Sequence, residues 1–322
     1  MRRISVVLFL TLALPAVASG GASDVKLSLV AYSTPREAYG QLISAFQKTN
    51  AGKDVSFTQS YGASGEQSRA VAAGLAADLV AFSLEPDVTS LVQKGLVLHS
   101  WKRNKWKGMV TRSVVVFVLR DGNPKHIRTW DDLVKPGVQV VTPNPFTSGG
   151  ARWNVMAAYG AQLRAGKTPA QAVAYLRKLF KHVVAQPSSA REALQTFLAG
   201  RGDAMLAYEN EALFAQQKGQ SVQFLIPKAT ILIENPIAVT AKSSHKAQAN
   251  AFVNYLHTLP AQKIFAENGY RPLLKAATAG HSFPSRPQLF TIAYVGGWAK
   301  VEKRFFDPKT GVMAKIEGSL GG

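Results

Sequence analysis

Residues 142–154 read TPNPFTSGGARWN, and this stretch joins an apolar run to a helical pattern. The β-branched run at 138–141 precedes it and predicts a strand. After it, apolar residues recur at helical spacing over 151–163. The triplet Ser148-Gly149-Gly150 lies where the predicted helix begins. The stretch is therefore the connection of a strand–loop–helix unit.

The same alternation of strand and helix continues on both sides of this unit. The run SVVVFVL at 113–119 is the strongest strand pattern in the chain. Helices are predicted between the strands, and further strands are predicted at 25–30, 55–57, 78–82, 204–206 and 222–226. This order predicts an α/β fold with open, mostly parallel sheets that are flanked by helices.

The chain has 322 residues, a length that suggests two domains, and no low-complexity linker divides it. We therefore expect two lobes and a hinge made of strands that cross between them, near 115–122 and 229–240. The first lobe would then hold residues 24–116 together with 236–322, and the second lobe residues 117–235.

Four predicted helix starts carry polar residues that suit a helix N-terminus. Residues 34–37, 64–67 and 189–192 have the spacing of capping boxes. The start at 148–150 differs, because two successive glycines add chain entropy without any gain in capping. The first turn of a helix has unpaired N–H groups and a partial positive charge, so each start is either an ordinary cap or an anion site. Spacing alone does not show whether the four starts meet.

The composition excludes several kinds of chemistry. The chain has no cysteine, so disulfides, thiolate metal sites, cysteine nucleophiles and a lipid anchor on cysteine are all excluded. There are 38 Lys and Arg against 19 Asp and Glu, a net charge of +19. Such a surplus favours nucleic acid, an anionic membrane or a small anion as the partner.

The N-terminus predicts export. The basic residues Arg2 and Arg3 precede an apolar run at 4–14 and a small-residue stretch at 16–20 that contains an A-x-A cleavage site. We expect residues 1–20 to be a cleaved signal peptide, because the apolar run is too short to span a membrane. An exported protein rarely meets nucleic acid, so the charge favours a small anion.

With these features together, the chain resembles the sulfate-binding protein family, the periplasmic receptors of sulfate ABC transporters. The resemblance runs from about residue 27 to 315 and rests on the long motif at 142–154 with four shorter ones: YGASGEQ at 61–67, ENE at 209–211, GYRP at 269–272, and LFTI with GGWAK at 289–300. It implies a two-lobed periplasmic-binding-protein fold of type II that closes on an oxyanion. It also implies a monomer, free in the periplasm, that delivers sulfate to the permease subunits in the inner membrane.

The resemblance further implies which residues bind the anion. Ser64, Gly149, Gly150 and Ala190 would donate backbone N–H groups, and Ser148 its hydroxyl. Sulfate is a dianion without a proton, so a pocket of neutral donors suits it. Hydrogenphosphate needs an acceptor for its proton, and such a pocket penalises it.

Two positions depart from the family pattern. Tyr208 replaces the usual tryptophan before the ENE motif, and its phenol can accept a hydrogen bond as well as donate one. Ser33 replaces an aspartate, which removes a negative charge and leaves a hydroxyl that can donate to the anion. These two changes leave thiosulfate, molybdate or tungstate open as alternative ligands.

Other functions find little support in the sequence. The six histidines lack metal-ligand spacing, and there is no nucleophile elbow, so we expect no metal, no cofactor and no catalytic residue. Glu209 and Glu211 are two residues apart and would point to different sides of a helix. A sulfate-ester hydrolase and a protein that binds anionic polymers remain remote alternatives. The basic, aromatic run at 101–107 suits single-stranded nucleic acid by composition, but in an exported protein we expect a solvated loop.

Overall fold

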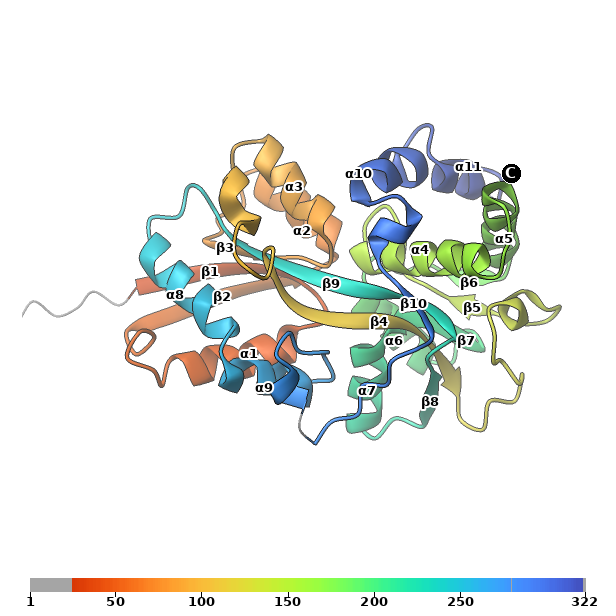
Figure 1. The fold of residues 1–322 in the computed structure, drawn as a ribbon, viewed down its shortest axis with the longest axis horizontal. Coiled ribbons are helices and arrows are strands. Elements are labelled where there is room, and N and C mark those ends of the chain that lie inside the picture. The colour runs from red at the N-terminus through yellow and green to blue at the C-terminus, as the bar shows by residue number, and fades with distance from the viewer. Residues whose placement is uncertain (1–24, 279, 321–322) are drawn as a thin grey trace, which may run out of the picture.

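The computed structural model describes residues 25–278 and 280–320, which form two lobes joined by two long strands (Figure 1). In the first lobe, β2, β1 and β3 are parallel and lie in that order. Helices α1, α8 and α9 pack on one face of this sheet, and α2 and α3 pack on the other. The bounds are β1 Val25–Tyr32, α1 Arg36–Phe46, β2 Val55–Gly62, α2 Ser64–Ala72, β3 Leu79–Ala81, α3 Glu85–Gln93, η1 His99–Lys102, α8 Lys246–Leu256 and α9 Leu259–Glu267.

The second lobe repeats this arrangement. Strands β7, β5 and β6 are parallel, and β4 runs antiparallel to β7 and β8. Helices α4 and α5 pack on one face, and α6 and α7 on the other. The bounds are η2 Asp131–Val134, β5 Val140–Val141, α4 Gly149–Arg164, α5 Pro169–Lys181, β6 Val183–Ala185, α6 Ala190–Leu198, β7 Ala204–Tyr208, α7 Glu209–Gln217 and β8 Val222–Leu225.

Two long antiparallel strands, β4 (Met109–Arg120) and β9 (Ala229–Val239), cross between the lobes (Figure 1). The last residues of β9 pair with β3 in the first lobe. The second half of β4, from Val115 on, pairs with β7 in the second lobe. The α/β class with two lobes and a hinge of crossing strands, predicted from the sequence, is therefore confirmed. β4 crosses slightly earlier than expected, before residue 115.

The end of the chain differs from the sequence expectation, which placed all of residues 236–322 in the first lobe. Helices α8 and α9 do pack there, but Trp298, Phe305 and Ile316 share a core with Trp153 of the second lobe. The reason is that α4 is buried almost all round, so the face turned away from the sheet also needs apolar cover. The C-terminal elements from residue 288 on supply that cover: β10 Gln288–Phe290, η4 Ile292–Val295, α10 Trp298–Val301, η5 Glu302–Phe306 and α11 Val312–Gly318. The turn before them, η3 Lys275–Thr278, packs on α9 in the first lobe.

One helix ends earlier than its pattern predicts. The sequence predicts a helix over 66–75, whereas α2 ends at Ala72. Gly74 has a φ of 114°, and the N–H of Leu75 turns back to the carbonyl of Ala70 at 2.9 Å. A glycine in the left-handed region closes the helix in this way.

The predicted signal peptide at 1–20 lies outside the described residues. Within 25–278 and 280–320, none of the helices has both the length and the apolar character that crossing a membrane requires.

Candidate functional site: an uncharged cavity between the lobes

The first residues of α2, α4 and α6 meet at one small cavity between the lobes. α2 belongs to the first lobe, and α4 and α6 to the second. The cavity is small, with a volume of about 10 Å³, and no side chain in its wall carries a formal charge. Its wall consists of Tyr32, Ser33, Thr34, Ala63, Ser64, Ser83, Ser148, Gly150, Ala190 and Tyr208. Six of the seven residues singled out from the sequence are thus brought together.

The seventh, Gly149, lies beside the wall and packs against the first lobe. A Cβ added at Gly149 would lie 2.3 Å from Cδ2 of Leu84 and 2.7 Å from Oγ of Ser83. Gly150 is less crowded, since its nearest neighbours would be 3.4 Å from an added Cβ. Ser148 is the N-cap of α4 and lines the cavity. The first glycine is thus required for the close approach of α4 to the other lobe.

Four N–H groups at these helix starts have no acceptor in the described part of the chain. The N–H groups of Ser64, Gly149, Gly150 and Ala190 make no hydrogen bond outside their helices. N–H groups in a first helical turn have no acceptor inside the helix either. Buried N–H groups without a partner are unfavourable, and three helix starts add partial positive charge. The cavity therefore favours a small anion with several acceptor atoms.

Of the three capping boxes predicted from the sequence, the described residues form one, at α6. There the hydroxyl of Ser189 accepts from the N–H of Glu192, and the carboxylate of Glu192 accepts from the N–H of Ser189. The box at 34–37 was a wrong prediction: α1 has no side-chain cap, and the hydroxyl of Thr34 bonds instead to that of Tyr270 at 2.9 Å.

The box at 64–67 was also wrong, because Ser64 is the first helical residue of α2 and not its N-cap. Its hydroxyl donates to the carboxylate of Asp87 at 2.5 Å and accepts from the N–H of Ser83 at 2.9 Å. Burial raises the pKa of Asp87, against the opposing effects of Arg152 and of this hydrogen bond. The side chain of Ser64 is thus committed to the first lobe, which leaves its N–H for the cavity.

Ser83 was missed by the sequence analysis. It lies two residues after the end of β3 and lines the cavity, and its hydroxyl lies 2.6 Å from that of Tyr208. The signal was present, because ligands of open α/β sheets bind beyond the carboxyl ends of the strands. Tyr208 itself ends β7 and is the N-cap of α7. Burial raises the pKa of Tyr208 well above its ordinary value, so the phenol stays protonated.

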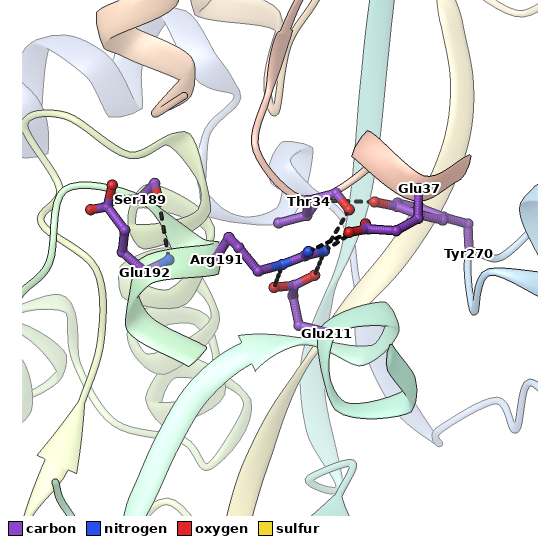
Figure 2. Close-up of polar contacts among 7 residues, drawn as sticks. All are labelled: Thr34, Glu37, Ser189, Arg191, Glu192, Glu211 and Tyr270. Carbon is purple, nitrogen blue, oxygen red and sulfur yellow. Dashed lines mark hydrogen bonds and ion pairs between the residues drawn. The ribbon is translucent and has the colours of Figure 1, made fainter. Parts of the chain in front are cut away.

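Arg191, the second residue of α6, connects the lobes next to the cavity (Figure 2). It makes two hydrogen bonds to Glu37 of α1, at 2.8 and 3.0 Å, and one to the carbonyl of Thr34 at 3.0 Å. Two more, at 2.9 and 3.0 Å, hold Glu211 of its own lobe. Burial works to raise the pKa of Glu37, but the hydrogen bonds and charge of Arg191 lower it below its ordinary value. The sequence pattern presented Arg191 only as part of a cap.

Glu209 and Glu211 serve as ion-pair partners. Arg271 holds Glu209 through two hydrogen bonds at 2.6 and 2.9 Å, and Arg191 holds Glu211. Both carboxylates are almost fully buried, and burial raises the pKa of each, against the effect of its arginine. Neither lines the cavity. In the described part of the chain, no three metal-ligating side chains come together.

The fold and the cavity define a two-lobed solute-binding protein, and comparison with known proteins agrees. A model of the family "Bacterial extracellular solute-binding protein" matches residues 27–271. The chain is 42% identical to the sulfate-binding protein of Synechococcus elongatus, over 94% of this chain and 90% of that protein. The sulfate-binding protein SubI from Mycobacterium tuberculosis matches in structure with a TM-score of 0.85 and 44% identity, over 88% of this chain and all of that one. The chain belongs to the sulfate-binding protein family.

The family also has relatives with other named ligands. The chain is 34% identical to the thiosulfate-binding protein of Pseudomonas aeruginosa, over 90% of this chain and 92% of that protein.

Proposed function

We propose that this protein is a receptor that captures sulfate and delivers it to an ABC transporter. The observation that carries the proposal is the uncharged cavity at which helix starts from both lobes meet. A ligand there contacts α2 on one side and α4 and α6 on the other. Its binding energy therefore favours the closed arrangement of the lobes, because only that arrangement offers all the donors at once.

The proposed ligands of sulfate are the N–H groups of Ser64, Gly149, Gly150 and Ala190 and the hydroxyl of Ser148. The hydroxyls of Ser33 and Tyr208 complete the set. No cation touches the anion, and its charge is balanced by many aligned dipoles at the helix starts. The wall also lacks a carboxylate, which would repel a dianion. We propose capture and release without chemical conversion, so the protein is not an enzyme.

The proposal includes the setting of the receptor. Residues 1–20 direct export and are removed, and the mature protein is a monomer, free in the periplasm because it has no cysteine for a lipid anchor. Its partners are the permease subunits in the inner membrane. For release, the first lobe, residues 24–116 with α8 and α9, rotates on β4 and β9 away from the second, residues 117–235 with the C-terminal helices.

Isothermal titration calorimetry tests the proposal. The purified mature protein is unfolded and refolded to remove bound ligand, and is then titrated with sulfate. We expect one site with a dissociation constant in the micromolar range or below. Competition with thiosulfate, molybdate and tungstate ranks the alternatives, and tighter binding of one of these would reassign the ligand. Absence of both heat and thermal shift with every tetrahedral anion would contradict the proposal.

A further inference from the structure

Two hydroxyl groups from opposite lobes meet in the wall of the cavity. Oγ of Ser83 and the phenolic oxygen of Tyr208 lie 2.6 Å apart, and each residue is only 1% exposed. Both residues line the cavity. Their hydrogen bond is therefore part of the surface that a ligand meets.

The main chain of Ser83 is held on both sides. Its N–H donates to the hydroxyl of Ser64 at 2.9 Å. Its carbonyl accepts from the indole N–H of Trp153 and the side-chain amide of Asn235, each at 2.9 Å. All main-chain bonding capacity of Ser83 is thus directed away from the ligand, and only its hydroxyl is left to turn. The position of the hydroxyl is fixed, whereas the direction of its hydrogen is not.

The hydrogens of this pair can be counted. Each hydroxyl has one hydrogen and two lone pairs, and one hydrogen is used between the two oxygens. The pair therefore offers a ligand one donor and also free lone pairs. Either oxygen can donate to the other, so either can face the ligand as the donor. A backbone N–H offers only a hydrogen.

We infer that the Ser83–Tyr208 pair lets this cavity bind singly protonated tetrahedral oxyanions, such as hydrogenphosphate, in addition to fully ionised dianions. The inference rests on the proposed function, because it concerns the same cavity. With sulfate, one hydroxyl donates to the anion and the other donates to the first. With hydrogenphosphate, one hydroxyl accepts a hydrogen bond from the O–H group of the ligand and donates to the second hydroxyl. The second hydroxyl then donates to another oxygen of the ligand. Every hydrogen then has an acceptor in both complexes.

Removing one hydroxyl breaks this chain of hydrogen bonds for the protonated ligand only. In Tyr208→Phe, the hydroxyl of Ser83 can still donate to sulfate. With hydrogenphosphate, the Ser83 hydroxyl must accept a hydrogen bond from the O–H group of the ligand. Its own hydrogen then has no acceptor, because the phenolic oxygen of Tyr208 is missing. An unmade hydrogen bond of this kind corresponds to about a tenfold loss in affinity. In Ser83→Ala, the hydroxyl of Tyr208 loses its neighbouring acceptor in the same way, so the two variants should behave alike.

The test is calorimetric titration of wild type, Tyr208→Phe and Ser83→Ala with sulfate, selenate and phosphate near neutral pH. Selenate is a tetrahedral dianion without a proton, so it controls for ligand shape. We expect wild type to bind all three anions. In each variant the ratio of the phosphate to the sulfate dissociation constant should rise about tenfold, while the selenate to sulfate ratio stays unchanged.

Tyr175→Phe is the matched control variant. It also removes a buried tyrosine hydroxyl, the one that donates to the carbonyl of Trp130, and neither residue lines the cavity. Its phosphate to sulfate ratio should equal that of wild type, and thermal unfolding reports whether each variant is folded.

The outcomes separate the inference from the proposed function. Sulfate binding without phosphate binding in wild type would overturn the inference and leave the sulfate receptor intact. Equal loss of phosphate and sulfate affinity in the variants would also overturn it, since the pair would then be only a contact between the lobes. If wild type binds no anion, the proposed function itself fails.

Discussion

Replacement of Glu37 by glutamine tests whether the contact between Arg191 and α1 stabilises the closed receptor. Two of the hydrogen bonds of Arg191, at 2.8 and 3.0 Å, end on this carboxylate. They join α6 of the second lobe to α1 of the first, one residue from the proposed donor Ala190 (Figure 2). Because they bridge the lobes, they exist only when the lobes are closed. Their loss should therefore weaken ligand binding without any change in the cavity wall.

The size of the effect follows from the exposure of the pair. The side chain of Arg191 is 15% exposed and that of Glu37 is 31% exposed, so solvent screens part of their attraction. Exposed pairs contribute up to about 1 kcal/mol, and the two-pronged geometry places this pair near that upper value. We expect Glu37→Gln to raise the sulfate dissociation constant about fivefold, mainly through faster release of the anion.

Calorimetry and stopped-flow fluorescence measure the two quantities. Glu85→Gln is the matched control, because Glu85 pairs with Lys102 inside the first lobe and that pair does not bridge the lobes. A loss of thermal stability in Glu37→Gln with unchanged sulfate affinity would refute the reasoning, since the contact would then stabilise the fold and not closure.

The contribution of the contact between Glu37 and Arg191 should also appear in the pH dependence of sulfate binding. The pKa of Glu37 is lowered from its ordinary 4.5, so its contribution is present above that value and is lost as the pH falls through the lowered pKa. Sulfate affinity should be flat near neutral pH. The difference between wild type and Glu37→Gln should shrink only below about pH 4.5.

Three further predictions concern single positions. Ser148→Ala should weaken sulfate binding by about 1–3 kcal/mol in calorimetry, because a hydrogen bond to a charged ligand is lost. Its control, Ser189→Ala, removes an equivalent helix cap outside the cavity wall and should mainly lower thermal stability. Gly149→Ala should abolish sulfate binding, since the new Cβ would lie 2.3 Å from Leu84, and Gly150→Ala should bind more tightly than Gly149→Ala. Burial works to raise the pKa of Asp132, but the ion pair with Lys135 and hydrogen bonds to residues 128 and 129 lower it. Asp132→Asn should therefore lower the melting temperature at neutral pH. This difference from wild type should shrink in acid, below about pH 4.

The architecture was predictable because its signals are local and repeated. A strand covered on both faces must be apolar throughout, and the run at 113–119 became the buried second half of β4. Strand and helix alternated clearly enough to predict both sheets. The C-terminal helices were misplaced because their apolar residues suit either lobe. Only the unpartnered outer face of α4 decides between them, and that face exists only in the folded lobe.

The site was predictable only in part, for a different reason. The glycines at 149 and 150 and the serine at 148 lie next to each other in the chain, and their pattern indicated a ligand. Ser83 and Arg191 act through partners that lie 125 and 154 residues away in sequence, Tyr208 and Glu37. No local pattern contains such contacts. The hydroxyls of Thr34 and Ser64 show the same limit, since distant partners displaced the caps that their spacing predicts.

The positive surplus of the chain, +19, acts at a distance from the cavity. The wall is uncharged, and two arginines between the lobes are matched by buried or half-buried glutamates: Arg191 by Glu37 and Glu211, and Arg271 by Glu209. Such pairs supply little net attraction to an anion. The remaining surface charge attracts every anion alike, raising the association rate in a way that salt screens. Discrimination among anions must then arise from hydrogen-bond donors and acceptors in the wall, so added salt should slow association while leaving the ratio of sulfate to selenate affinity unchanged.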